Sequence, residues 1–92
     1  MSLTRDEHRI RLGGSEVAVI GETGMVNATW TLDIDDQQVD RDTTGARNLT
    51  LLGVLDDGTS VEARVHQGAL GPTVITILHD GAEVTTYRGF VA

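Results

Sequence analysis

Apolar and polar residues alternate along several short stretches of this chain, and that alternation constrains the fold more than any other feature. The clearest case is Ala28–Asp35, where apolar residues alternate with Thr and Asp. Successive side chains of a β-strand point to opposite faces, so Trp30, Leu32 and Ile34 are predicted to face a core. Val61–His66 repeats the pattern, whereas no stretch shows the helical spacing of three and four residues. The chain is therefore predicted to be all-β.

Turn signals separate these stretches at short intervals. Asp57-Gly58 and Asp80-Gly81 each lie between two predicted strands, and both residue types tolerate the positive φ of tight hairpin turns. Residues 13–15 are rich in glycine and mark another turn, and residues 35–38 mark a reversal that contains no glycine. About seven to eight short strands joined in this way predict an antiparallel meander, folded as a β-sandwich or a β-barrel.

The length of the chain allows one core. Its 92 residues are expected to form a single domain, 1–92, with the polar residues 1–7 outside the fold. No apolar run approaches the ~20 residues that cross a bilayer, and the N-terminus lacks the apolar segment of a secretory signal. We therefore expect a cytoplasmic protein without membrane contact. Cysteine is absent, which excludes disulfides, thiolate zinc sites and cysteine nucleophiles.

The charge is strongly acidic. Fourteen acidic residues oppose seven basic ones, which gives a formal net charge of −7, and every basic residue is arginine. The lack of lysine excludes Schiff-base chemistry and a phosphate-loop lysine. Nucleic acid is not expected as a partner, because its binding depends on clustered cationic side chains and, for single strands, on several stacking aromatics. The chain has three aromatic residues.

An acidic hairpin is the most visible candidate for a metal site. Its five aspartates are Asp33, Asp35, Asp36, Asp40 and Asp42. Calcium takes six to eight oxygen ligands, so a loop dense in aspartate is a candidate calcium site. The spacing does not fit an EF-hand loop, because Gln38 stands at the glycine position and Thr44 at the closing glutamate position. We interpret the segment as a solvated acidic hairpin and predict no metal and no cofactor.

Catalytic chemistry finds little support in the sequence. The imidazoles are His8, His66 and His79, and the serines are Ser2, Ser15 and Ser60. In the predicted hairpin, His66 and His79 lie several residues apart along the ladder, so they are interpreted as surface residues. No serine lies in a Gly-x-Ser-x-Gly elbow. No catalytic residue is therefore predicted.

Two predicted strands carry apolar residues on both faces, namely Leu49–Leu55 and Val74–Leu78. Either both strands are central and covered, or their second faces are offered to a partner or to another copy of the chain. The second alternative predicts a partner surface made of Leu52, Val54, Val74, Leu78 and, from the glycine-rich loop 67–72, Leu70. Gly53 is expected to mark a bulge or a close approach of another segment.

Two functions follow from these alternatives. The first is a non-enzymatic module for protein contacts or self-association, with a homodimer as one form. The second is a small-ligand-binding barrel or a minor enzyme, with a polar pocket near His66 that Glu62 and Arg64 also line.

The hairpin order also resembles that of a known family. Leu32-Asp33-Ile34-Asp35 leads to Val39-Asp40-Arg41, and Leu49–Leu55 and Ile75–Gly81 follow. Over about two-thirds of the chain, Ala28–Phe90, this arrangement resembles a β-domain of the Fas apoptosis inhibitory molecule family. The chain departs from that family in its few aromatic residues, and no functional residue carries over. The resemblance implies a non-catalytic interaction domain.

Overall fold

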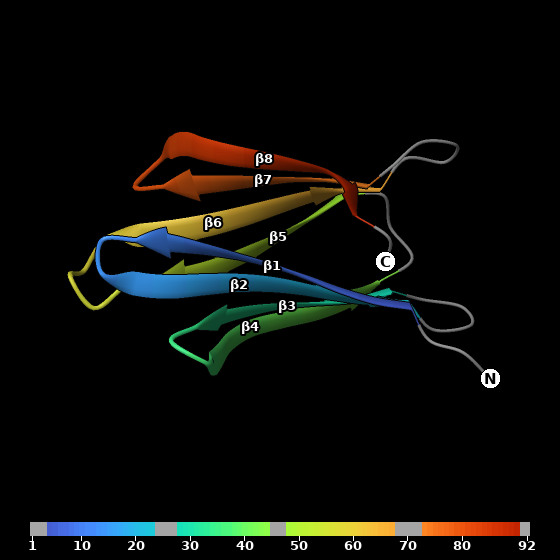
Figure 1. The fold of residues 1–92 in the computed structure, drawn as a ribbon, viewed down its shortest axis with the longest axis horizontal. Helices are drawn as coiled ribbons and strands as arrows, with labels where there is room; N and C mark the ends of the chain where they lie inside the picture. The colour runs from blue at the N-terminus through green and yellow to red at the C-terminus, as the bar shows by residue number, and fades with distance from the viewer. Residues whose placement is uncertain (1–3, 24–27, 45–47, 68–72, 91–92) are drawn as a thin grey trace.

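The computed structural model describes residues 4–23, 28–44, 48–67 and 73–90, which form eight antiparallel strands in two four-stranded sheets (Figure 1). The first sheet contains β1 (Thr4–Leu12), β2 (Ser15–Thr23), β3 (Ala28–Ile34) and β4 (Gln37–Thr44), in that order. The second contains β5 (Asn48–Val54), β6 (Ser60–His66), β7 (Thr73–His79) and β8 (Ala82–Phe90). The predicted all-β meander is confirmed, and it folds as a sandwich of two sheets.

The tight turns lie together at one end of the molecule, on the left in Figure 1. At Asp80-Gly81 the φ angles are 52° and 85°, and at Gly13-Gly14 they are 55° and 87°. Positive φ at both central residues is the signature of a type I′ turn, whose twist matches the twist of the flanking strands. Asp35-Asp36 adopts the same conformation without glycine, with φ angles of 51° and 64°. The Asp35 carboxylate supports it by accepting a bond from the Glu16 backbone N–H at 3.0 Å.

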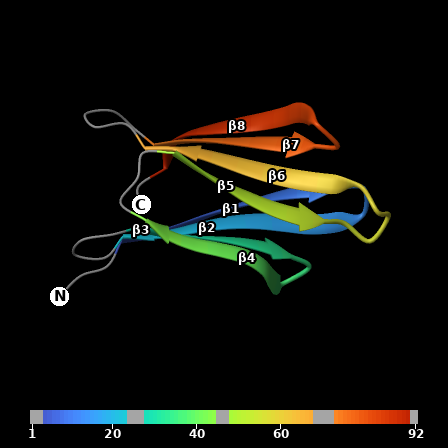
Figure 2. The ribbon, with the colours of Figure 1, turned by 180° about the vertical axis from the view of Figure 1, so that it is seen from behind.

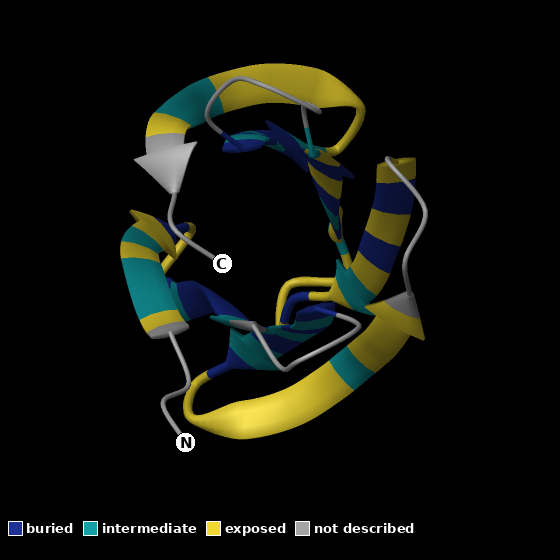
Figure 3. Cartoon of the chain, turned by 90° about the vertical axis from the view of Figure 1, so that its right-hand side faces the viewer, coloured by how far each residue is buried: buried dark blue, intermediate teal, exposed yellow. Residues whose placement is uncertain are grey.

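The core fills the space between the sheets. As the alternation predicts, Trp30, Leu32 and Ile34 are buried there. The other large side chains that are fully buried are Leu51, Ile75, Ile77, Val17, Val19, Val61 and Val65. Figure 3 looks along the strands and shows both sheets curving around this common interior. One continuous apolar interior therefore stabilises both sheets.

Side chains bridge the two seams where the sheets meet. At the β4–β5 seam, the Asp40 carboxylate accepts a bond from the backbone N–H of Leu52 at 2.8 Å. At the other seam, between β1 and β8, the rings of His8 and Tyr87 stack with centroids 4.2 Å apart. The Tyr87 hydroxyl also donates a hydrogen bond to the Arg9 carbonyl at 3.4 Å. At each seam, a side chain thus forms a hydrogen bond with a backbone group of an edge strand. That backbone group would otherwise be open to pairing with another chain.

Each sheet contains a bulge at an equivalent place. In β4, Val39 is the extra residue where Leu32 pairs with Asp40 and Asp33 pairs with Gln38. In β8, Val84 is the extra residue where the β7–β8 register shifts in the same way. A bulge leaves one residue outside the regular ladder, and both valines are 44% exposed. Val39 and Val84 therefore occupy equivalent bulge positions in the two sheets, so a variant at one position can serve as a control for a variant at the other.

The N-terminal segment differs from expectation. Residues 1–7 were expected outside the fold, but Thr4–Glu7 belong to β1 and pair with Ile20–Thr23 of β2. The polar composition of β1 is compatible with a strand because β1 lies at the edge of its sheet. In the described part of the chain, no helix has the length and apolar character needed to cross a membrane.

Candidate functional site

An exposed apolar patch lies at the β4–β5 seam. The large hydrophobic side chains that are exposed among the described residues are Val39 (44%), Leu52 (58%), Val54 (66%) and Val84 (44%). Val84 lies on β8, at the far edge of the second sheet from β5. The other three lie on β4 and β5, which neighbour one another at the seam (Figure 2). We call Val39, Leu52 and Val54 the seam patch.

Gly53 makes this arrangement sterically possible. A Cβ atom added to Gly53 would lie 2.9 Å from Cδ1 of Ile34, 3.0 Å from Cγ2 of Val39 and 3.4 Å from Cδ2 of Leu32. A larger residue at this position would therefore require the side chains of Ile34 and Val39, or β5 itself, to shift. The sequence predicts a bulge or a close approach here, and the structure shows the close approach.

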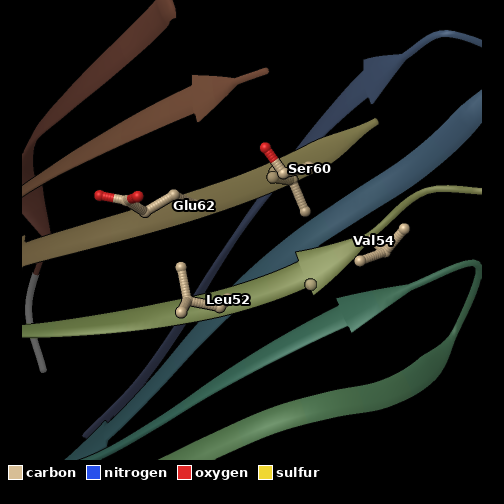
Figure 4. Close-up of a pocket in the computed structure, with 6 residues that line it drawn as sticks. Leu52, Val54, Ser60 and Glu62 are labelled. Atoms are coloured by element: carbon tan, nitrogen blue, oxygen red, sulfur yellow. The ribbon is translucent and has the colours of Figure 1, made fainter. Parts of the chain in front are cut away.

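The seam patch borders an apolar hollow of about 330 Å³ on the outer surface of β5 and β6. Its lining residues are Leu52, Gly53, Val54, Ser60, Val61 and Glu62. Figure 4 shows Leu52 and Val54 on one strand facing Ser60 and Glu62 on the next. The Glu62 carboxylate forms an ion pair with Arg64, which offsets its charge at the rim. An aliphatic side chain would be a suitable occupant of such a hollow.

A second hollow, of about 300 Å³, lies on the other side of Val54. Its lining residues are Ile34, Asp35, Gln37, Val39, Val54 and Asp56. Both aspartates are exposed, and they make this hollow acidic. Val54 thus forms a ridge with an apolar hollow on one side and an acidic hollow on the other.

The residues of the predicted partner surface differ in how far they are exposed in the structure. Leu52 and Val54 are exposed, whereas Leu78 is only 9% exposed and Val74 is half-buried. The reason is position, because β5 is an edge strand and β7 lies between β6 and β8. Leu78 therefore cannot contribute to a partner surface as predicted. Leu70 lies outside the described residues.

The three residues of the predicted polar pocket, Glu62, Arg64 and His66, alternate with buried residues along β6 and lie on its outer face. Glu62 lines the apolar hollow beside Leu52 and Val54. Arg64 and His66 are exposed, and Nδ1 of His66 lies 2.6 Å from Oδ1 of Asn48.

The aspartates of the acidic hairpin have separate roles. Asp36 lies 3.2 Å from a guanidinium nitrogen of Arg9, and Asp40 is part-buried at the seam. Within the described ranges, no three His, Asp or Glu side chains come together in a way that could hold a metal ion.

The structure reveals one polar cluster that the sequence analysis did not single out. The Thr59 hydroxyl donates to Asp57 at 2.5 Å, and its oxygen lies 2.8 Å from Nε2 of His79. A carboxylate only accepts hydrogen bonds, so the Thr59 proton is directed to Asp57 and His79 donates to the Thr59 oxygen. His79 is therefore not placed as a base that activates this hydroxyl. The cluster instead ties the β5–β6 turn to β7.

This cluster predicts a specific dependence on acid. The Thr59 hydroxyl and, next, the Thr59 backbone N–H hold the pKa of Asp57 below its ordinary value. A lowered pKa contributes stability that is present above the unfolded pKa of about 4 and is lost as pH falls through the folded pKa. Thr59→Val removes the hydroxyl donor, so the pKa of Asp57 should rise toward its ordinary value. An NMR titration of the Asp57 carboxyl measures this shift directly.

The same variant gives a stability test. The difference in unfolding free energy between wild type and Thr59→Val should shrink as pH falls through the folded pKa of Asp57. Urea denaturation at a series of pH values measures this difference. Equal Asp57 pKa values in the two proteins would contradict the role assigned to the hydroxyl.

Comparison of the chain with protein-family models, with curated proteins and with solved structures found no match to any of them. The resemblance to the Fas apoptosis inhibitory molecule family therefore stays a prediction. The geometry of the site is the basis on which function can be argued.

Proposed function

We propose that this chain is a non-enzymatic protein-interaction module that contacts its partner through the seam patch. The observation that carries the proposal is the gathering of Val39, Leu52 and Val54 on one seam, beside two hollows. Covering these side chains with a partner would remove apolar area from water, which is the main driving force of protein association. Contiguous exposed apolar residues beside polar ones are typical of contact sites.

The polar chemistry of the described residues also favours this function over an enzyme. His79 donates to Thr59 instead of accepting its proton, and His66 interacts with Asn48 on the surface. The proposal includes a cytoplasmic location, which the cysteine-free sequence favours.

Site-specific photo-crosslinking in the native host tests this proposal. A photoreactive residue at position 54 should give a discrete adduct, whereas the same residue at position 84 should not. Excess unlabelled wild-type protein should compete for the adduct. The double variant Leu52→Thr/Val54→Thr should compete at least tenfold less well, because each change removes apolar area from the patch. Identical adducts at positions 54 and 84, or equal competition by the variant, would contradict the proposal.

A further inference from the structure

We propose that the seam patch recognises a segment of another protein in which an aliphatic side chain lies next to arginine or lysine. This inference rests on the proposed function and adds the chemistry of the partner. It follows from the two hollows that meet at Val54, one apolar and one acidic.

The apolar hollow sets the first requirement. Leu52 and Val54 flank it and are the two most exposed large hydrophobic side chains among the described residues. Glu62 at its rim is already paired with Arg64. An aliphatic side chain entering here would bury both residues without leaving a charge unpaired.

The acidic hollow sets the second requirement. Asp35 and Asp56 line it, and the chain as a whole has a formal net charge of −7. The bond from the Glu16 backbone N–H orients the Asp35 carboxylate but does not neutralise it. A guanidinium or ammonium group one side-chain length from the aliphatic anchor would meet a complementary charge, and the acidic surface would attract it at long range.

The same charges disfavour a second copy of this chain as the occupant. A symmetric pair joined through the seam patch would place the same patch of each copy against the other, since a two-fold interface is self-complementary. Asp35 and Asp56 of one copy would then lie near those of the other. Juxtaposed like charges at an interface disfavour association. A basic partner would be attracted by the same aspartates that would repel a second copy of this chain.

The mode of contact is also constrained. The Leu52 backbone N–H is bonded to Asp40, so it is not available to an added strand. We therefore expect recognition through side chains in the two hollows, with no strand added to β5 at Leu52.

Binding of three short probe peptides, followed by NMR of the whole chain, tests the inference. Each peptide has a Gly/Ser background around one triplet, which is Arg-Leu-Arg, Arg-Ser-Arg or Glu-Leu-Glu. The Arg-Leu-Arg probe should give saturable shifts at the amides of Val39, Leu52, Val54 and Asp56. Its affinity should exceed that of the other two at least tenfold and should fall as salt is raised. Equal binding of Arg-Leu-Arg and either other probe, or no saturable shift, would overturn the inference.

Variants of the chain separate the two requirements. Leu52→Thr/Val54→Thr should weaken Arg-Leu-Arg binding at least tenfold at any salt concentration. Asp35→Asn/Asp56→Asn should weaken it by a similar factor at low salt and remove most of the salt dependence. Val84→Thr, at the equivalent bulge of the other sheet, should bind as wild type does. All these side chains are exposed, so amide spectra should show an unchanged fold.

Failure of this inference can be distinguished from failure of the proposed function. A competed adduct at position 54 without preference for the Arg-Leu-Arg probe would overturn the basic partner and leave the interaction module standing. Concentration-dependent dimerisation in light scattering, abolished by Leu52→Thr/Val54→Thr, would identify a second copy as the occupant and likewise overturn the inference.

Discussion

Trp30→Ala should lower the free energy of unfolding by about 3–5 kcal/mol, the usual cost of truncating a large buried aromatic residue. Trp30 has no exposed surface and lies on β3, in the middle of the first sheet. Its removal leaves a cavity between the sheets that neighbouring strands can fill only in part. Small domains have total stabilities of roughly 5–15 kcal/mol, so this variant should be close to its unfolding limit.

Urea denaturation followed by far-ultraviolet circular dichroism measures this effect. Fluorescence is unsuitable because Trp30 is the only tryptophan in the chain. Val84→Ala is the control, since Val84 is 44% exposed and its truncation should change stability by only about 0.5 kcal/mol. Comparable losses in the two variants would show that the interior does not depend on packing around Trp30.

The sequence predicts the inward faces of the strands and the turns because both depend on neighbouring residues. Alternation alone assigns Trp30 to the core, and Asp80-Gly81 alone predicts a reversal. The order of strands in a sheet is not local information. Leu52 and Leu78 lie in stretches with the same two-sided apolar pattern, but β5 is an edge strand whereas β7 lies between β6 and β8 within its sheet. Leu52 is 58% exposed and Leu78 is 9% exposed, and this difference depends on the strand order, which neither stretch contains.

The candidate site likewise depends mostly on contacts between strands that are distant in the sequence, which local sequence patterns do not predict. Val39 is a single apolar residue in an acidic stretch, and only the bulge in β4 and the approach of β5 place it beside Gly53 and Val54. The Thr59–His79 contact depends on the register that pairs Val61 with His79, which is likewise set by the fold. Gly53 was the one local signal of the seam, because a glycine inside a strand often marks a close approach.

Gly53→Val should lower the free energy of unfolding by about 1–3 kcal/mol, the range found when bulk is added to a packed site. Even the first added carbon would lie 2.9 Å from Cδ1 of Ile34 and 3.0 Å from Cγ2 of Val39. Valine is otherwise well suited to a strand, so a loss of stability must come from this contact. Thr50→Val is the matched control, because it places valine at an exposed position of the same strand and should be nearly neutral.

A double-mutant cycle identifies the contact responsible. If Val39 is the obstacle, Val39→Ala should be less harmful, or even favourable, when Gly53 is replaced by alanine. The coupling energy between the two positions should be about 1 kcal/mol, within the range for residues in direct contact. Chemical denaturation of the wild type, both single variants and the double variant measures it. Additive effects would mean that Ile34 or the backbone, and not Val39, limits the space at Gly53, and that the seam patch is held together by other contacts.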